Sequence, residues 1–596
     1  MQESSTALIA PATTTGTLAD LAFRNAERSP GRIAFTKRVG SGWADVTAAR
    51  FRDEVTALAK GFVASGIRTG DAVAIMSKTR YEWTLADCAL WAVGAIPVPI
   101  YETSSAEQVQ WILQDSGAVG AVLESAAHKA LVDQVRGEAP ALQQVWVLDD
   151  GAVAALTRAG TDVADDALGA AREGLDRTSP ATLIYTSGTT GRPKGVVLSH
   201  GNFLDLAENC SDKLAEVVRA DGSSTLLFLP LAHVFARFIE VLALEAEVRM
   251  GHSSDIKSLL ADFAAFRPTF ILAVPRVFEK IYNSSEAQAT AGGKGTIFTK
   301  AAATAIAWSE SLDSGRTPLA LKAQHTVFDK LVYARLRAAM GGQVAYAVSG
   351  GAPLGTRLGH FFRGIGVTIL EGYGLTETTA PATVNLPDRM KIGTVGLPLP
   401  GVSIGIADDG EVLIKGINVF SGYHHNPEAT AEAIQDGWFH TGDVGELDGD
   451  GFLRITGRKK EILVTAGGKN VAPAVLEDRL RAHPLVSQCL VVGDQKPFIG
   501  ALITLDDEML PGWASNNGLT GLTPERARTN EAVLAELQKA VDDANLAVSK
   551  AESIRKFAVL DTDFTEENGY LTPSLKLKRN IIMRDFADEV EALYGG

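Results

Sequence analysis

Short apolar runs alternate with longer helical patterns through most of the chain, and this alternation constrains the fold more than any other feature. Residues 51–69 have the spacing of a helix, and residues 71–76 follow as a buried strand. A second strand, residues 181–185, runs directly into a loop of Thr, Ser and Gly. Residues 283–345 are Ala-rich and predict helices, with an exposed turn at 291–295. Strands that alternate with helices in this way indicate an α/β fold.

The length and composition predict a globular protein with at least two domains. A chain of 596 residues exceeds one ordinary hydrophobic core. Its 46% hydrophobic and 21% charged residues are typical of a folded protein, not of a disordered one. The formal net charge of −15 argues against broad, non-specific binding to nucleic acid.

Targeting and cysteine patterns favour a reducing cytoplasm. The first residues do not have the pattern of a secretory signal, and the longest apolar run, residues 88–100, is too short to span a bilayer. Cys88, Cys210 and Cys489 are too few and too far apart for a disulfide framework or a cysteine-based zinc site. We expect a cytoplasmic protein; peripheral contact with the inner face of the membrane and a homodimer are both compatible with the sequence.

From residue 410 onward the pattern changes to short strands and turns. Residues 444–456 predict a hairpin in which Asp448-Gly449 supplies the positive-φ turn. An EF-hand would require further ligand positions and a closing Glu after Asp448 and Asp450, and these are missing. The turn is therefore the better interpretation.

The densest motif is the loop that follows the second strand, Tyr185-Thr-Ser-Gly-Thr-Thr-Gly-Arg-Pro-Lys-Gly195. Its backbone N–H groups and hydroxyls suit phosphate oxygens, and its lysine supplies a compensating charge. The spacing is not that of a Walker A loop, because Pro193 precedes the lysine and the earlier glycine is missing. We predict that this segment is a phosphate-binding loop; the alternative interpretation is a flexible surface loop. Its candidate residues are Thr186, Ser187, Gly188, Thr189, Thr190, Gly191 and Lys194.

A second candidate segment is Glu371-Gly-Tyr-Gly-Leu-Thr-Glu377. Its two glycines would let the backbone approach a ligand closely, and Tyr373 offers a flat face to a base. Thr376 and Glu377 provide a hydroxyl and a carboxylate suited to phosphate and Mg²⁺. Taken alone, the segment is explained equally well as an ordinary strand-to-helix turn.

Two further segments carry isolated polar groups. Asp443, at the end of Trp438-Phe-His-Thr-Gly-Asp443, and Arg458, which follows Gly457, could clamp a ribose or form an inconsequential surface salt bridge. His233 stands among apolar residues. A histidine in such a segment is more often a hydrogen-bonded core residue than a catalytic one.

Together, and in this order, the segments resemble the adenylate-forming superfamily of acyl-CoA synthetases, luciferases and peptide-synthetase adenylation domains. The resemblance runs from about residue 20 to the C-terminus. It implies an α/β fold in which a large N-terminal domain has sheets packed between helices and a small, mobile C-terminal domain is α+β. The implied boundaries are residues 1–459 for the adenylation and acyl-binding domain and residues 460–596 for the mobile domain.

The resemblance also implies roles for individual residues. The loop 186–195 would hold the ATP phosphates, Glu377 would hold Mg²⁺, and Asp443 with Arg458 would bind the ribose hydroxyls. Thr376 would contact the α-phosphate, and His233 and Lys194 would join it as catalytic candidates. The adenine would be lined by Gly350, Gly351, Ala352 and Tyr373, and Glu371, Gly372 and Gly374 would also belong to the ATP- or AMP-binding residues.

The C-terminal part of the resemblance supplies a hinge and a second lysine. Lys460 would be the hinge, and Lys576 would be the adenylation lysine. Many family members have Gly immediately before this lysine, whereas this chain has Leu575, so Lys578 stays open as a competitor. The glycine loop after the hinge would face the thiol tunnel for CoA, through Gly467, Gly468 and Lys469.

The chain is most similar to the long-chain fatty acyl-CoA branch, in its length, its helical stretch after residue 283 and its segments 228–237 and 569–573. This similarity implies that ATP, a fatty acid and CoA become acyl-CoA, AMP and pyrophosphate through an acyl-adenylate, with Mg²⁺ as cofactor. One alternative is a fatty acyl-AMP ligase that delivers to a carrier protein, although no downstream carrier domain is evident. A nucleotide-binding regulator without catalysis is the other.

Overall fold

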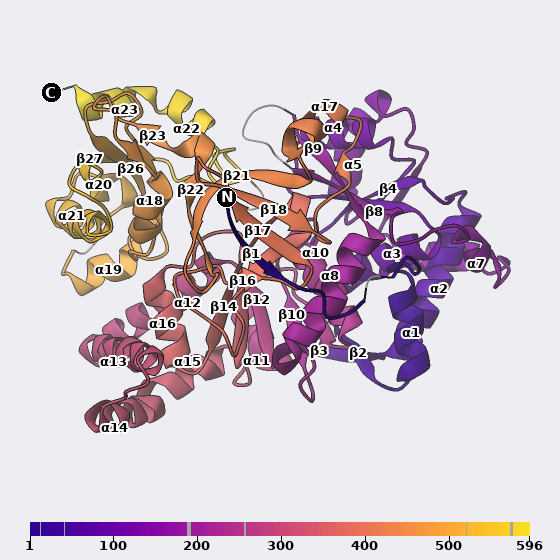
Figure 1. The fold of residues 1–596 in the computed structure, drawn as a ribbon, viewed down its shortest axis with the longest axis horizontal. Coiled ribbons are helices and arrows are strands. Elements are labelled where there is room, and N and C mark those ends of the chain that lie inside the picture. The colour runs from indigo at the N-terminus through magenta and orange to yellow at the C-terminus, as the bar shows by residue number, and fades with distance from the viewer. Residues whose placement is uncertain are drawn as a thin grey trace.

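The structure of the protein is a computed structural model, and it describes residues 1–11, 13–40, 42–186, 192–255, 258–519, 521–572 and 576–595. Figure 1 shows a large body and, at its upper left, a smaller one in light orange and yellow that carries the C-terminus. The large body contains several sheets with helices on their outer faces, so the predicted α/β class is confirmed.

The first sheet is wholly parallel, in the order β5-β4-β6-β7. All five residues of its β4 are buried, as expected of a strand covered on both faces, and the predicted strand 71–76 is confirmed. Its strands are β4 (Ala72–Met76), β5 (Ile96–Ile100), β6 (Gly120–Leu123) and β7 (Gln144–Val147). The helices in the same part of the chain are α2 (Ala48–Ala64), α3 (Tyr81–Ala92), α4 (Ala106–Ser116), α5 (Ala126–Val135), α6 (Ala152–Ala159) and α7 (Ala167–Ala171).

The helix α2 differs from the predicted range 51–69 at both ends. It begins at Ala48, because the Thr47 hydroxyl accepts a hydrogen bond from the Arg50 N–H and caps the first turn. It ends at Ala64, and Gly66 follows in the left-handed region with φ +88°. The apolar periodicity therefore located the helix but not its ends.

Three further sheets complete the large body together with a short hairpin sheet. A five-stranded sheet has β12 (Phe270–Ala273), β13 (Tyr346–Ser349), β14 (Thr368–Leu375), β15 (Ala380–Val384) and β16 (Leu397–Pro398). A four-stranded sheet has β10 (Ser224–Leu227), β11 (Arg249–His252), β2 (Ile33–Val39) and β3 (Gly42–Thr47). A six-stranded sheet has β1 (Gln2–Thr6), β17 (Val402–Ile406), β18 (Glu411–Gly416), β20 (Ile434–Gln435), β21 (Trp438–Leu447) and β22 (Leu453–Arg458). The hairpin sheet has β8 (Pro180–Thr186), β9 (Lys194–Ser199) and β19 (Gly422–Tyr423).

The hairpin between β21 and β22 is confirmed, but its predicted turn residues are wrong. Gly451, with φ +85°, takes the left-handed conformation, and Gly449 does not. The Asp448 carboxylate accepts hydrogen bonds from the N–H groups of Asp450 and Phe452 and closes the turn. The loop is longer than the two residues that an Asp448-Gly449 turn would have, so the positive φ falls at Gly451, two residues after Gly449.

The helical stretch after residue 283 is confirmed, and it forms the lower left of Figure 1. It contains α12 (Pro275–Ala291), α13 (Gly295–Asp313), α14 (Leu319–Phe328) and α15 (Ala334–Ala339), and a π-helical turn (Asp329–Tyr333) joins the last two. The other helices of the large body are α1 (Asp20–Arg28), α8 (His200–Lys213), α9 (Ala215–Val218), α10 (Val234–Glu245), α11 (Leu259–Phe266), α16 (Thr356–Gly364) and α17 (Pro427–Ala433).

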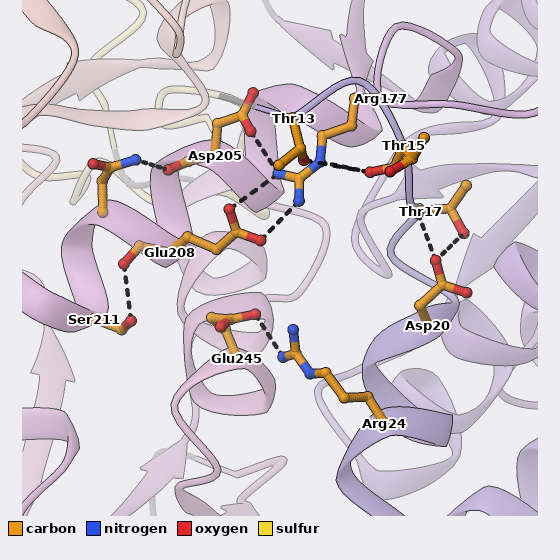
Figure 2. A network of polar contacts seen from close by, with 11 residues as sticks. Thr13, Thr15, Thr17, Asp20, Arg24, Arg177, Asp205, Glu208, Ser211 and Glu245 are labelled. Carbon is orange, nitrogen blue, oxygen red and sulfur yellow. Dashed lines mark hydrogen bonds and ion pairs between the residues drawn. The ribbon is translucent and has the colours of Figure 1, made fainter. Parts of the chain in front are cut away.

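A polar network ties the N-terminal segment to the helices of the interior (Figure 2). The Arg177 guanidinium donates to the Thr15 carbonyl and forms ion pairs with the carboxylates of Asp205 and Glu208 on α8. Arg24 on α1 pairs with Glu245, the last residue of α10, at 2.6 Å. Both contacts hold in place helices that line the cavity described below.

The C-terminal domain has apolar clusters of its own, which contain only residues from Leu463 onward. Its strands are β23 (Leu463–Val464), β24 (Asn470–Val471), β25 (Val486–Val492), β26 (Ile499–Leu505) and β27 (Ile554–Val559). Its helices are α18 (Pro473–Arg481), α19 (Leu510–Asn516), α20 (Pro524–Ala527), α21 (Glu531–Asn545), α22 (Arg579–Asp585) and α23 (Ala587–Tyr594). An independent core is what a separately folded small domain requires.

Within the part of the chain that the structure describes, no helix combines the length and the apolar character needed to cross a membrane.

Candidate active site

A cavity of about 3020 Å³ lies between the large body and the C-terminal domain, with walls from both. Most of the residues predicted for the site line it, although they come from segments far apart in the chain. They are Thr186, His233, Gly350, Gly351, Ala352, Glu371, Gly372, Tyr373, Gly374, Thr376, Glu377, Asp443, Arg458, Lys460 and Lys576. The structure thus brings the separate motifs to a single site.

Asp443 is the centre of one polar cluster in this cavity. It lies on β21 opposite Arg458 on β22, and the Arg458 Nε is 2.8 Å from one carboxylate oxygen. The Tyr373 hydroxyl donates to the other oxygen at 2.6 Å. Asp443 is only 4% exposed, so this is not the surface salt bridge that the sequence left open. Each oxygen keeps a second acceptor position, as a vicinal diol would require.

Tyr373 remains a neutral donor in this cluster. Burial, followed by the Asp443 carboxylate, raises the pKa of Tyr373 well above its usual value. The hydroxyl therefore keeps its proton for the hydrogen bond to Asp443 at the cavity wall.

Glu377 is the centre of a second cluster. It lies in a 3₁₀ turn (Thr376–Thr378) after β14, and one of its oxygens accepts a hydrogen bond from the Tyr423 hydroxyl at 2.9 Å. The Lys194 ammonium lies 5.0 Å from the centroid of the same Tyr423 ring. Tyr423 thus connects Lys194, which itself does not line the cavity, to Glu377, and no sequence motif had singled it out.

The Glu377 carboxylate fits the usual protein contribution to a Mg²⁺ site. It lines the cavity, and one oxygen is held by the neutral Tyr423 hydroxyl, which leaves the other for a ligand. Mg²⁺ commonly takes one or two carboxylates from the protein and the rest of its ligands from phosphates and water. Among the described residues there is no group of three or more His, Cys, Asp or Glu side chains that could hold a metal ion.

The glycines of the Glu371–Glu377 segment lack side chains for a reason other than the predicted one. A Cβ at Gly374 would lie 1.5 Å from the Ala380 carbonyl oxygen, and one at Gly372 would lie 2.9 Å from that of Thr383. The backbone of the neighbouring strand β15 therefore leaves no room for side chains at these two positions. Gly351 is different, because its φ of +84° itself favours glycine at the cavity wall.

Glu371 faces a carboxyl group of the C-terminal domain. Its side chain accepts a hydrogen bond from the Leu354 N–H at 3.1 Å, and burial followed by the charge of Asp478 raises its pKa to about 7. Asp478 on α18 also has a pKa of about 7, because burial outweighs the opposing effect of Arg481. Glu371 of the large body and Asp478 of the C-terminal domain, both with a pKa raised to about 7, thus lie close to each other between the two domains.

Lys576 reaches into the middle of these clusters. Its side chain stays accessible to water in the cavity, yet enough atoms surround it that burial, followed by Arg458, lowers its pKa. Asp443, Glu377 and Glu461 act in the opposite direction. Lys578 also lines the cavity, but it is the residue immediately before α22, and its side chain makes no capping hydrogen bond to that helix. The structure therefore brings Lys576 to the carboxylates of both clusters.

His233 lies at the first turn of α10. Its Nδ1 accepts a hydrogen bond from the Phe235 N–H at 3.2 Å. Burial, followed by the positive charge of Lys576, lowers its pKa to about 4. The imidazole is therefore neutral near pH 7, with its proton on Nε2. Its place on the cavity wall beside Lys576 favours the catalytic alternative over the core one.

The predicted phosphate loop is described only at its ends. Thr186 closes β8 opposite Lys194 at the start of β9, and both flank the loop. Ser187, Gly188, Thr189, Thr190 and Gly191 lie outside the described residues. Arg192 stacks over Trp111 of α4 at 4.8 Å, and the Trp111 Nε1–H donates to the Pro193 carbonyl at 2.8 Å. Trp111 lies 82 positions before Pro193 and could not have been found by spacing.

The predicted CoA loop is not brought to the cavity. Gly467, Gly468 and Lys469 join β23 to β24, and they are exposed. Lys469 pairs with Glu552 at 3.4 Å. These residues stand apart from the other predicted site residues.

Lys460 lies between two anchored neighbours. Lys459 pairs with Asp409 at 2.6 Å in the large body, and Glu461 pairs with Arg579 at 3.4 Å in the C-terminal domain. Lys460 itself is exposed and forms no ion pair with any residue that the structure describes.

One arm of the cavity is apolar and was not predicted. Phe235, Phe238, Ile239 and Leu242 line it from one face of α10, at the helical spacing i, i+3, i+4, i+7. Further apolar lining residues come from α8, the residue that joins it to α9, α9 itself and β12, and they are Cys210, Leu214, Val217, Val218 and Phe270. That spacing on residues 235–242 is a signal that sequence reasoning could have used.

The opposite face of α10 is fixed to the core by a buried ion pair. The Arg237 Nε donates to Asp87 of α3 at 3.0 Å, and both side chains are fully buried. The guanidinium also lies between Trp83 and Trp91, 5.5 and 5.4 Å from their rings. One face of the helix thus lines the cavity while the other is anchored.

Comparison with known proteins identifies the family of this chain. Residues 22–424 match the family described as AMP-binding enzyme, and residues 460–596 match the AMP-binding enzyme C-terminal domain. The chain is 52% identical over 581 residues to long-chain-fatty-acid–CoA ligase FadD15 of Mycobacterium tuberculosis, covering 97% of each chain. It is 30% identical to the peroxisomal long chain acyl-CoA synthetase 7 of Arabidopsis thaliana, covering 91% of this chain and 80% of that protein.

Solved structures share the fold. The adenylation domain of a carboxylate reductase from Mycobacterium chelonae has a TM-score of 0.76 at 24% identity, covering 99% of this chain and 92% of that one. The anthranilate CoA ligase AuaEII in complex with anthranoyl-AMP has a TM-score of 0.74 at 19% identity, covering 98% and 99%. The predicted superfamily is confirmed, and the chain belongs to the family of AMP-binding enzymes.

Proposed function

We propose that this enzyme is an AMP-forming long-chain fatty acid–CoA ligase, which converts ATP, a fatty acid and CoA into acyl-CoA, AMP and pyrophosphate. The observation that carries the proposal is the union of two environments in one cavity. The Asp443 and Glu377 clusters offer polar groups for a nucleotide, and the α10 face offers an apolar arm for a hydrocarbon chain. The 52% identity to a ligase of this description over nearly the whole chain supports it.

In the first half-reaction this chain has to orient two anions. Asp443, with Arg458 and Tyr373, would hold the ribose hydroxyls, and Gly350, Gly351 and Ala352 would flank the base. Lys194, Thr376 and the loop 186–191 would hold the phosphates. A carboxylate attacks a phosphate poorly unless both are positioned and their charge is offset.

Lys576 would supply that offset between the fatty carboxylate and the α-phosphate, with the neutral His233 beside it. As the carboxylate oxygen bonds to the α-phosphorus, the bond to pyrophosphate breaks and pyrophosphate leaves. Mg²⁺, held by Glu377 together with the phosphates, would supply charge stabilisation to this step.

In the second half-reaction the CoA thiolate attacks the acyl carbonyl and AMP leaves. We assign residues 1–459 and 460–596 to the two domains and the hinge to Lys460. Lys459 is anchored to the large domain and Glu461 to the small one, so a rotation would concentrate at the residue between them. Such a rotation would remove Lys576 from the site and could bring Gly467, Gly468 and Lys469 toward it.

We assign the enzyme to the cytoplasm, as the three cysteines suggest; all three are free and buried.

Products of the purified enzyme with ATP, Mg²⁺, palmitate and CoA test the function. Palmitoyl-CoA with equal amounts of AMP and pyrophosphate is expected. Formation of palmitoyl-AMP without thioester, or of ADP in place of AMP, would refute it.

A further inference from the structure

The helix that runs from α14 through the π-helical turn into α15 presents an apolar stripe to solvent. Leu319, Val327 and Leu331 are 83%, 55% and 55% exposed. Ala323, Ala334 and Ala338 continue the stripe and are exposed too. The spacing of these residues, four, four, four, three and four, keeps them on one face for about 30 Å of helix. We define residues 319, 323, 327, 331, 334 and 338 as the outer stripe.

The opposite face of the same helix makes its contacts with the rest of the protein, so the outer stripe is not needed for packing. His325 stacks on Trp308 of α13 at 4.2 Å and bonds to the Gly364 carbonyl at 2.7 Å. The Tyr333 hydroxyl donates to the Ala301 carbonyl at 2.7 Å. α14 itself contains no buried residue and lies at the outer corner of the molecule (Figure 1).

Cations flank the outer stripe. Lys322, Lys330 and Arg335 are exposed, and none forms an ion pair within the described residues. Residues 316–339 contain five Lys or Arg and one Asp, a net charge of about +4, while the whole chain carries −15. A helix with an exposed apolar face and flanking Lys or Arg has the character of one that lies in a membrane interface.

We propose that the outer stripe docks on the surface of an anionic lipid bilayer, with Lys322, Lys330 and Arg335 at the level of the headgroups. The local positive charge favours this occupant over a second copy of the chain, because two copies meeting through the stripe would bring these cations together. An acidic protein surface would complement the charges, but a bilayer also accepts a straight apolar stripe of this length without a matching groove.

The position of the stripe relates it to the cavity. Ala339, immediately after the stripe, lines the cavity, and so does Leu260 on the adjacent α11, which is half exposed. Docking would therefore place this rim of the cavity against the lipid, where a long-chain acid is dissolved. This consequence rests on the proposed function, whereas the docking itself does not.

Flotation of the full-length protein with vesicles tests the docking. Vesicles of phosphatidylcholine alone and of phosphatidylcholine with phosphatidylglycerol distinguish the apolar and charged parts. Lys322→Glu/Lys330→Glu/Arg335→Glu should weaken binding to the anionic vesicles by at least about a hundredfold, since the loss of each cation near such a surface costs about fivefold and the new carboxylates are repelled as well. Leu319→Gln/Val327→Gln/Leu331→Gln should weaken binding to both kinds about tenfold or more.

Matched controls separate the stripe from general charge and hydrophobicity. Arg68→Glu/Arg526→Glu/Lys550→Glu reverses three exposed cations elsewhere, and Ile9→Gln/Val39→Gln/Leu546→Gln removes three similarly exposed apolar side chains. Both controls should bind vesicles within about twofold of the unsubstituted chain. Equal weakening by the control sets would overturn the proposal.

Two further outcomes would also overturn the docking. One is unchanged vesicle binding in both stripe variants. The other is loss of a dimer in sedimentation with unchanged vesicle binding, which would assign the stripe to a second copy. Acyl-CoA formation from detergent-dispersed palmitate, without vesicles, is a separate readout that both stripe variants should retain. If the unsubstituted enzyme lacks that activity, the proposed function fails while the vesicle result still decides the docking.

Discussion

Replacing Lys576 with alanine should abolish most of the first half-reaction and leave the second nearly intact. The ammonium lies where Asp443, Glu377 and Arg458 all act on it, between the proposed ribose and Mg²⁺ groups. Two unit charges about 4 Å apart interact by about 4 kcal/mol at an effective dielectric constant of about 20. Removal of one preorganised donor to a developing charge commonly costs about 10²–10³ in rate. We therefore expect acyl-adenylate formation to fall about 10³-fold.

The two half-reactions can be measured separately. Pyrophosphate release from ATP and palmitate without CoA, in a single turnover, reports adenylation. Supplied palmitoyl-AMP and CoA report thioester formation, which should change by less than about threefold in Lys576→Ala. Lys578→Ala is the matched control, because Lys578 lines the same cavity two residues later. It should lose little of either activity.

The pH dependence adds a second readout for Lys576. Burial and Arg458 lower the pKa of this lysine, so raising the pH removes its charge earlier than for an exposed lysine. Adenylation should therefore decline on the alkaline side in the unsubstituted enzyme, and this limb should be missing from Lys576→Ala. Equal loss of both half-reactions in Lys576→Ala, or loss of adenylation in Lys578→Ala instead, would refute the assignment.

Three other substitutions test the remaining parts of the site. Glu377→Ala should cut adenylation about 10²-fold and weaken its Mg²⁺ dependence, while Tyr423→Phe, which removes only the supporting hydroxyl, should cost about tenfold; an unchanged Mg²⁺ titration in Glu377→Ala would contradict the assignment. Lys460→Pro should retain adenylation within about threefold and lose thioester formation by at least about a hundredfold, since proline fixes φ where the rotation is placed; matching losses in both half-reactions would exclude the hinge. The pKa of Glu371 is raised to about 7 in the folded protein, so the free energy of unfolding decreases as the pH rises from about 4.5 through about 7. Glu371→Gln should therefore be more stable than the unsubstituted chain at pH 8, by up to about 3 kcal/mol, with no gain at pH 4. Denaturant unfolding at the two pH values checks this, and an equal effect at both would show that ionisation is not the cause.

Local patterns in the sequence predicted the parts of the fold that local physics decides. The strand at residues 72–76 and the strand that ends at Thr186 were found because buried strands are short, apolar and bounded by polar turns. Helix ends were less accurate, because the Thr47 cap and the Gly66 termination involve single residues that periodicity does not register. The glycine with positive φ in the β21–β22 turn was misplaced for the same reason.

The candidate site was predicted through its motifs, and what the motifs omit is long-range contact. Tyr423 supports Glu377 from 46 positions away, and Trp111 supports the phosphate loop from 82 positions away, counted to Pro193. Neither residue belongs to a segment with a recognisable pattern. Even Gly374 was predicted for the wrong reason, because the carbonyl that excludes its side chain belongs to β15. Packing of this kind requires the three-dimensional structure.

The two faces of α10 make substrate range and folding stability separable traits. Phe238 and Leu242 line the apolar arm of the cavity, while the Arg237–Asp87 pair anchors the opposite face of the same helix. If this arm holds the acyl chain, as we propose, bulkier or smaller side chains at positions 238 and 242 should shorten or lengthen the accepted chain while the anchor keeps the helix in place. Substitutions at these two positions could therefore adapt related enzymes to different fatty acids without loss of folding stability. The same two positions are a starting point for engineering another chain length.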